Sequence, residues 1–231
     1  MAALGTSYDA LGIERYALTL DNRALREAAA LAPYDHLEIL MNDRKYGGGG
    51  IFNLYATCAA HSSSAPYLFV HEFGHCFAGL ADEYYTSPVA YEEGVSPGQE
   101  PWEPNVTALS DPAALKWRAL VTPTPLPTPW HKQEFDDWSA RLHRRAPGDA
   151  CPRRHRGGDG GVPGAWPGRE QGDARQRGAR RCGGRVEGAA YQARGLYRPS
   201  VDCVMFTRNL DIGFCPVCAR AIEGVIDLYA Q

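Results

Sequence analysis

Two histidines and a glutamate lie close together in the sequence HEFGHCFAGLADE, which runs from residue 71 to residue 83. His71 and His75 are four residues apart, so on a helix they share one face. Two imidazoles in that arrangement can hold one Zn2+, with each nitrogen at about 2.0–2.1 Å from the metal. Glu72 lies about 100° further around the helix, where its carboxylate can act as general base toward a zinc-activated water. The motif therefore predicts a zinc-dependent hydrolase of peptide bonds.

A third metal ligand is expected just beyond this helix. Gly79 suits a helix C-terminus, because glycine adopts a positive φ without steric cost. The chain can then turn back and bring Asp82 or Glu83 toward the metal. Asp82 is preferred, since zincins with a glycine turn place their third ligand three residues after the glycine; Glu83 would then orient a histidine ring. The competing interpretation is a buried helix whose histidines only make hydrogen bonds.

The zinc motif is accompanied by the segments KYGGGGIFNLYAT, PWEPNVTAL, KWRALVTP and GLYRPSVDCVMFTRN. With them, the chain resembles the IgA-specific metallopeptidase family of metzincin-like zinc endopeptidases. The resemblance implies an α+β fold, with a twisted mixed sheet over the HExxH active-site helix and a C-terminal helical subdomain. It also implies one catalytic Zn2+ and a methionine-containing turn beneath the metal, which Met205 matches.

The chain departs from the metzincin signature HExxHxxGxxH at two points. One extra residue separates His75 from Gly79, and an acid replaces the third histidine. Cleavage of immunoglobulin A is not carried over, because a fold and a site do not determine the substrate.

Size and charge limit the class of protein. The chain has 231 residues, enough for one catalytic domain with a sizeable core, so residues 1–231 are predicted to form a single zinc metallopeptidase domain. A net charge of −3 gives no reason to expect nucleic acid or an anionic membrane as partner. The sequence contains no run of about 18 consecutive apolar residues, the length that a membrane-spanning helix needs. The expected partner is a protein or peptide substrate, and the expected state is a monomer.

The first twenty residues lack the pattern of a signal peptide. They contain Asp9, Glu14 and Arg15, and no basic start precedes an apolar block. The resemblance, however, implies a secreted, periplasmic or cell-surface enzyme. We therefore expect the chain to be truncated at its N-terminus.

The cysteines allow several interpretations. An odd number of seven excludes complete pairing within one molecule. Cys215 and Cys218 form a CxxC sequence, which could be half of a zinc site, a redox pair or part of a disulfide. A four-cysteine zinc site would need a second CxxC, and the sequence has none. A disulfide from Cys203 to Cys215 or Cys218 would tie the methionine turn to the last helix in an oxidising compartment; free buried thiols are the alternative.

Local patterns predict the elements around the motif. Asp21 is expected to cap a helix over 22–32, and residues 37–41 are expected to form a buried strand. Ile51 to Thr57 is the candidate edge strand beside the substrate cleft. The preceding glycines, 47–50, are read either as part of this arrangement or as a flexible loop.

Further along the chain, residues 84–110 are predicted to form a long loop lining the cleft, and Asn105 begins a glycosylation sequon. Asp111 and Pro112 are expected to start a helix over 113–120. A last helix is predicted over 216–229 from its apolar spacing.

Residues 144–186 depart from the rest of the chain. Positions 151–185 contain ten glycines and nine arginines, without helical or strand periodicity. The favoured interpretation is a stretch read out of frame between two compensating shifts; a disordered insertion is the main alternative, and nucleic-acid binding a distant third.

The leading hypothesis is therefore a zinc endopeptidase with His71, His75 and Asp82 as ligands and Glu72 as general base. Tyr197 and Arg198 are candidates for stabilising the oxyanion. The alternative hypothesis is a zinc-stabilised binding or surface protein, or an inactive remnant of such a peptidase, because the anomalous segment could have removed activity.

Overall fold

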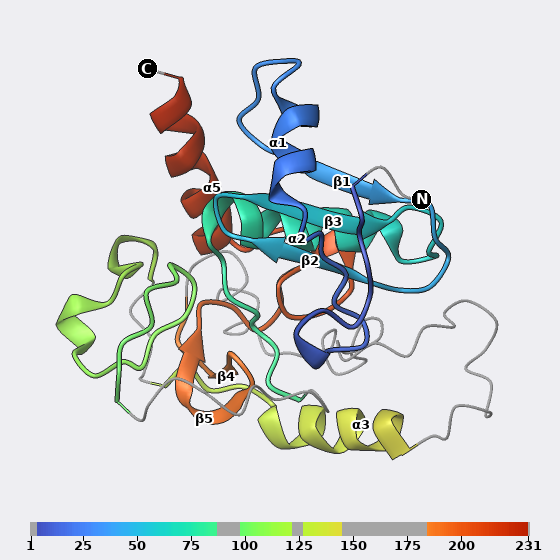
Figure 1. The fold of residues 1–231 in the computed structure, drawn as a ribbon. Helices are drawn as coiled ribbons and strands as arrows, with labels where there is room; N and C mark the ends of the chain where they lie inside the picture. The colour runs from blue at the N-terminus through green and yellow to red at the C-terminus, as the bar shows by residue number, and fades with distance from the viewer. Residues whose placement is uncertain (1–3, 87–97, 122–126, 145–183, 231) are drawn as a thin grey trace. The chain divides into compact units, whose positions relative to one another are not determined.

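The computed structural model describes residues 4–86, 98–121, 127–144 and 184–230 (Figure 1). These residues fall into two compact units. The first unit has residues 4–79 and 224–230, and the second has residues 80–86, 98–121, 127–144 and 184–223. The anomalous segment predicted at 144–186 lies outside the described residues except at its ends. Both units mix helix with strand, so the chain has the predicted α+β character.

The first unit contains a three-stranded mixed sheet in the order β1-β3-β2. β1 (Glu38–Met41) runs parallel to β3 (Tyr55–Ala59), and β2 (Gly48–Ile51) runs antiparallel to β3. α1 (Asn22–Ala29) precedes the sheet, and the Asp21 carboxylate caps it by accepting a hydrogen bond from the Ala24 amide at 2.9 Å. The mixed sheet, the strand β1 and the capped helix confirm the sequence predictions, but β1 is not buried as expected, because Leu40 is 61% exposed.

α2 (Ala65–Ala78) lies against one face of this sheet (Figure 1). Pro66 stands in its first turn, where a missing amide hydrogen costs nothing. At its other end Gly79 has φ 61°, and its amide donates to the His75 carbonyl at 3.1 Å. The predicted glycine C-cap is confirmed, and it ends the helix four residues after His75.

The predicted edge strand at Ile51 to Thr57 is wrong. Ile51 ends β2, the chain turns at 52–54, and Tyr55 to Thr57 belong to the central strand β3. The glycine run itself forms the outer strand β2, not a flexible loop. Its lack of side chains has a packing reason, because β2 approaches α2 too closely for a Cβ atom at Gly50.

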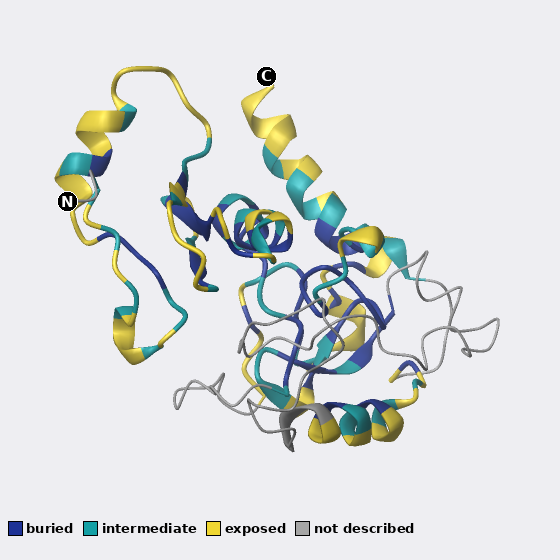
Figure 2. Ribbon diagram, turned by 90° about the vertical axis from the view of Figure 1, so that its right-hand side faces the viewer, coloured by how far each residue is buried: buried dark blue, intermediate teal, exposed yellow. Residues whose placement is uncertain are grey.

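The second unit contains α3 (Lys132–Arg144) and an antiparallel hairpin of β4 (Val186–Ala189) and β5 (Gln192–Arg198). α5 (Pro216–Tyr229) begins in it, and its bounds match the helix predicted at 216–229. α5 is buried at its start and exposed near the C-terminus (Figure 2). Because of the hairpin, the described part of this unit is mixed rather than the helical subdomain that the family resemblance implied.

The α-helix predicted at 113–120 is also wrong. The chain instead forms two short 3-10 turns, Pro112–Ala114 and Arg118–Leu120. Between them, Trp117 is 3% exposed, and its indole nitrogen donates to the Gly184 carbonyl at 2.8 Å. This long-range contact outweighs the local helix propensity of the segment. The predicted Asp111 cap is present, because its carboxylate accepts from the Ala113 amide at 2.8 Å.

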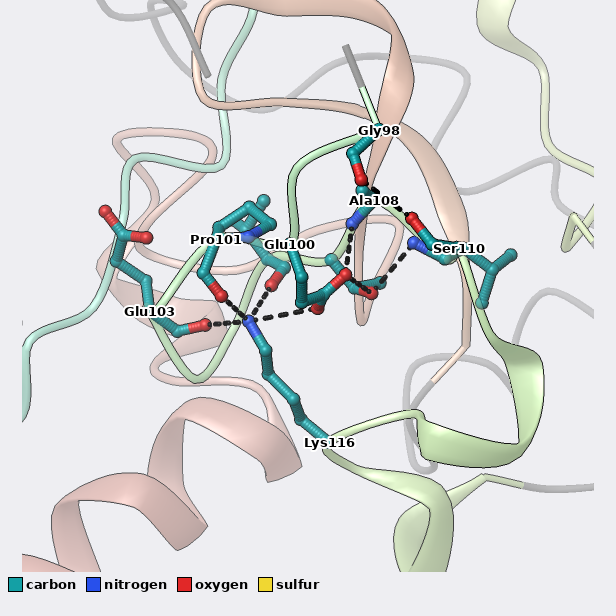
Figure 3. Close-up of polar contacts among 10 residues, drawn as sticks. Gly98, Glu100, Pro101, Glu103, Ala108, Ser110 and Lys116 are labelled. Carbon is teal, nitrogen blue, oxygen red and sulfur yellow. Dashed lines mark hydrogen bonds and ion pairs between the residues drawn. The ribbon is translucent and has the colours of Figure 1, made fainter. Parts of the chain in front are cut away.

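Lys116 organises the loop before these turns (Figure 3). Its ammonium group donates to the carbonyl oxygens of Glu103 at 2.8 Å, Val106 at 2.7 Å and Pro101. It also pairs with the Glu100 carboxylate at 3.2 Å. One side chain therefore provides hydrogen bonds to several carbonyl oxygens of an irregular segment. Helices and strands do not supply partners for these oxygens.

Substituting Lys116→Met should lower the free energy of unfolding by about 2–4 kcal/mol, because charge-assisted hydrogen bonds contribute about 1.5–3 kcal/mol each. Urea unfolding followed by tryptophan fluorescence would measure this. Arg23→Met is the matched control: Arg23 pairs with Glu27 at 2.8 Å on the exposed face of α1, and such pairs contribute about 0–1 kcal/mol. Equal effects of the two substitutions would contradict the bracing role of Lys116.

Candidate metal centre

The two motif histidines converge on one point beside α2. Their Nε2 atoms are 3.2 Å apart, and their rings are perpendicular, with centroids 4.7 Å apart. Two nitrogen ligands of a tetrahedral Zn2+, each at about 2.0–2.1 Å, would be separated by about 3.3 Å. The spacing of the Nε2 atoms therefore fits a shared metal ion.

Tyr67 supports His71 from one helical turn earlier. The Tyr67 hydroxyl lies 3.2 Å from His71 Nδ1, and the two rings stack with centroids 5.1 Å apart. Engaging Nδ1 fixes the orientation of the ring and leaves Nε2 for a metal. Tyr67 was not predicted from the sequence, although its position four residues before His71 was a usable signal.

Glu72 and His75 both lie against the glycine strand. A Cβ atom on Gly48 would be 3.3 Å from Glu72 Cγ, and one on Gly50 would be 2.8 Å from His75 Cβ. Glu72 is only 8% exposed. The absence of side chains at Gly48 and Gly50 therefore makes room for the predicted base and the second histidine.

Asp82 belongs to the second unit. Asp82 is three residues after Gly79, so the Cα atoms of the two residues are at most about 11 Å apart. The Tyr191 hydroxyl donates a hydrogen bond to the Asp82 carboxylate, and it also lies 3.0 Å from the Tyr84 hydroxyl. Tyr191 was missed in the sequence, because nothing local links it to a residue more than a hundred positions earlier.

The turn between β4 and β5 holds the backbone around Asp82. The Ala190 amide donates to the Asp82 carbonyl at 2.9 Å, and the Tyr191 amide donates to the Tyr84 carbonyl at 3.0 Å. Both turn residues have positive φ, 46° for Ala190 and 64° for Tyr191, as a two-residue hairpin turn requires. The hairpin therefore fixes segment 82–84 through both backbone and side chain.

The Glu83 side chain, unlike that of Asp82, is enclosed by an amide and a thiol in the interior of the second unit. Its side chain is fully buried, and its Oε1 accepts hydrogen bonds from Asn105 Nδ2 at 3.1 Å and from Cys218 Sγ at 3.2 Å. Burial raises the pKa of Glu83 well above its usual value. The prediction that Glu83 orients a histidine ring is wrong, because the described partners of its carboxylate are an amide and a thiol.

The sequon at Asn105 is not a glycosylation site in the folded chain. Asn105 is fully buried, and its side-chain nitrogen, the atom that would carry a glycan, donates to the Ala81 carbonyl at 2.9 Å and to Glu83. Its oxygen accepts from the Ala81 amide at 2.8 Å. Asn105 is a structural residue that anchors the backbone next to Asp82.

The prediction that Arg198 stabilises the oxyanion is wrong. It is fully buried, and its guanidinium donates to the Gly188 carbonyl at 2.6 Å and lies 3.9 Å from the centre of the Phe206 ring. Burial lowers the pKa of Arg198 to about 10. Its guanidinium is therefore committed to the interior of the second unit, while the role of Tyr197 stays a prediction.

Met205 lies in a hydrogen-bonded turn, as the resemblance implied. The amides of Phe206 and Thr207 donate to the Cys203 carbonyl at 2.9 and 3.0 Å. The Met205 carbonyl in turn accepts from the Glu83 amide at 2.9 Å. The methionine turn and the segment after Asp82 therefore form one hydrogen-bonded arrangement within the second unit.

A cluster of three thiols and one carboxylate, here called the thiol cluster, adjoins this turn; its members are Cys203, Cys215, Cys218 and Glu83. All are buried, and all three cysteines are free thiols. Burial raises the pKa of Cys203 and of Cys218, whereas hydrogen bonds from those two thiols lower the pKa of Cys215 to about 6. This cluster was not predicted from the sequence, because its members are separated by up to 135 positions.

A comparison with protein families shows that a model described as IgA Peptidase M64 matches residues 1–226. The match confirms the resemblance carried by the zinc motif and its accompanying segments. A comparison with curated proteins finds no match. None of the helices in the described ranges has the length and apolar character that a membrane crossing needs.

Proposed function

The chain belongs to the IgA peptidase M64 family, and on this premise we propose that it is a zinc-dependent endopeptidase acting on protein substrates. The family supports a peptidase that uses a metal. The identity of the metal as Zn2+ is supported by the two Nε2 atoms 3.2 Å apart on α2, since imidazole is a ligand of choice for zinc. This convergence is the observation that carries the proposal.

Asp82 is proposed as the third ligand, with His71 and His75 as the first two. The hydrogen bonds of the two carboxylates favour it over Glu83. The Glu83 carboxylate is engaged by Asn105 and Cys218, whereas the Asp82 carboxylate is oriented by Tyr191, the kind of outer contact that metal-binding carboxylates have. Three protein ligands leave a fourth position for chemistry, as catalytic zinc sites do.

Glu72 is proposed as the general base. Zinc, when bound, would act as a Lewis acid that polarises the scissile carbonyl and makes water a stronger acid. The Glu72 carboxylate then accepts the proton of the attacking water and delivers it to the leaving amine. Its burial against β2 limits the number of positions that this carboxylate can adopt.

The experiment that tests the proposal measures zinc and proteolysis on the same purified chain. We expect zinc, determined by mass spectrometry, in an amount that falls by one per chain in the double variant His71→Ala/His75→Ala. Hydrolysis of a denatured protein substrate should stop with a chelator and return with added Zn2+. A chain that holds no histidine-dependent zinc, or that cleaves equally well after chelation, would overturn the proposal.

Secretion and a monomeric state stay predictions.

Tyr191→Phe tests the role of the hairpin in holding Asp82. Loss of the hydroxyl removes the hydrogen bond to the Asp82 carboxylate, and such outer contacts contribute about 10–100-fold in metal affinity. We expect competition with a zinc chelator to show a weakening of that size at the site that depends on His71. Tyr229→Phe, at the exposed end of α5, is the matched control and should change nothing. An unchanged affinity in Tyr191→Phe would contradict the role of Asp82 or its support.

A further inference from the structure

We propose that the thiol cluster is a second metal site, which binds a structural Zn2+ through three thiolates and one carboxylate. Its ligands all lie in the second unit, so the site is independent of the histidines of α2. The sequence hides it, because only Cys215 and Cys218 are neighbours in the chain. The other two ligands come from the methionine turn and from the residue after Asp82.

The distances fit tetrahedral zinc. Cys203 Sγ and Cys218 Sγ are 3.8 Å apart, and two thiolates at about 2.3 Å from one zinc would be separated by about 3.8 Å. Cys218 Sγ lies 3.2 Å from Glu83 Oε1, against about 3.5 Å for a sulfur and an oxygen on the same ion. All four ligand atoms lie within 4.8 Å of one another.

One oxygen of Glu83 points independently to a ligand. Glu83 Oε2 is buried and has no hydrogen-bond partner among the residues that the structure describes. A carboxylate oxygen without a partner in a fully buried position costs folding free energy. A divalent cation among the three sulfurs, held by both oxygens of the Glu83 carboxylate, would satisfy Oε2 as well as Oε1. It would also supply the positive charge that buried thiolates need.

A disulfide or redox role fits the cluster less well. A disulfide requires sulfur atoms about 2.05 Å apart, whereas Cys203 Sγ and Cys218 Sγ are 3.8 Å apart and all three cysteines are free thiols. Thiol–disulfide exchange needs an accessible sulfur. Cys203 and Cys218 are fully buried, and Cys215 is only 4% exposed, so an incoming thiol cannot reach them.

The proposed zinc would join three segments of the second unit. Cys203 lies at the start of the methionine turn, Glu83 follows Asp82, and Cys215 and Cys218 stand at the start of α5. Four protein ligands close the coordination sphere, which is typical of structural rather than catalytic zinc. The ion would therefore act as a cross-link in a unit whose described strands form only one hairpin.

Zinc counting on the full chain tests this proposal. Native mass spectrometry should find two zinc ions in the unsubstituted protein and one in His71→Ala/His75→Ala. Cys218→Ser should also lose one zinc, whereas Cys58→Ser, which removes a buried thiol of the first unit, should keep both. If His71→Ala/His75→Ala holds no zinc, the second site is overturned whatever becomes of the first.

Cobalt distinguishes the two sites without relying on a cysteine variant that fails to fold. His71→Ala/His75→Ala loaded with Co2+ should show intense near-ultraviolet bands from sulfur-to-cobalt charge transfer, because its remaining site is rich in thiolates. The absence of these bands would overturn the proposal. So would peptide mapping that finds a disulfide among Cys203, Cys215 and Cys218 in the purified protein. If the unsubstituted protein holds both zinc ions but hydrolyses no peptide, the result counts against the proposed endopeptidase and not against the second zinc site.

Discussion

Glu72→Gln should lower kcat/KM for peptide hydrolysis by about 10²–10⁴-fold, because that is the usual contribution of a positioned general base. Glutamine is nearly isosteric with glutamate but cannot accept the proton of the attacking water. The fold reduction corresponds to about 2.7–5.5 kcal/mol of transition-state stabilisation. Initial rates on a quenched fluorescent peptide identified from a library would measure it.

The zinc content separates this effect from a loss of structure. Glu72 is not a proposed ligand, so Glu72→Gln should keep the zinc that His71→Ala/His75→Ala loses. Glu27→Gln, on the exposed face of α1, is the matched control and should retain full activity. A Glu72→Gln variant that keeps more than about a tenth of the rate would show that the base lies elsewhere.

Local spacing was sufficient to predict how the part of the candidate site on one helix is arranged. His71, Glu72 and His75 are placed by helical periodicity, and Gly79 ends the helix where a positive φ is needed. Asp21 likewise indicates the start of α1 through its own side chain. Each of these features depends on residues within four positions of one another, so the sequence contains all the information that they require.

The rest of the site depends on contacts between distant residues. Tyr191 reaches Asp82, and Cys218 reaches Glu83, across more than a hundred positions. The strands β4 and β5, which carry Tyr191 to that place, were not predicted, since their apolar residues show no clear alternation. A distant contact can also prevent an element that local residues predict. The hydrogen bond from Trp117 to Gly184 is found where the local sequence favoured a helix.

The glycines at 47–50 are explained by close packing and not by backbone flexibility. Four consecutive glycines allowed a flexible loop as one of two interpretations, whereas Gly48 to Gly50 belong to a strand with fixed partners in β3. Their φ values are outside the left-handed region, so backbone freedom does not explain them. Space does: a Cβ atom on Gly50 would lie 2.5 Å from the Glu72 carbonyl oxygen.

Gly50→Ala should therefore damage both stability and metal binding. The added methyl group meets the Glu72 carbonyl at 2.5 Å and His75 Cβ at 2.8 Å, and neither can yield without moving α2 against β2. Overpacking of this kind costs about 1–3 kcal/mol, which urea unfolding would measure. Since the displaced residues include a proposed base and a proposed ligand, zinc affinity at the histidine site and activity should fall as well.

Gly224→Ala is the matched control for this steric argument. Gly224 lies within α5, and nothing stands within 4 Å of the position that an added methyl group would take. Alanine is favoured over glycine inside a helix by about 1 kcal/mol, so this variant should be as stable as the parent or more so. If Gly50→Ala behaved in the same way, the close approach of β2 to α2 would not be what keeps glycine beside His75.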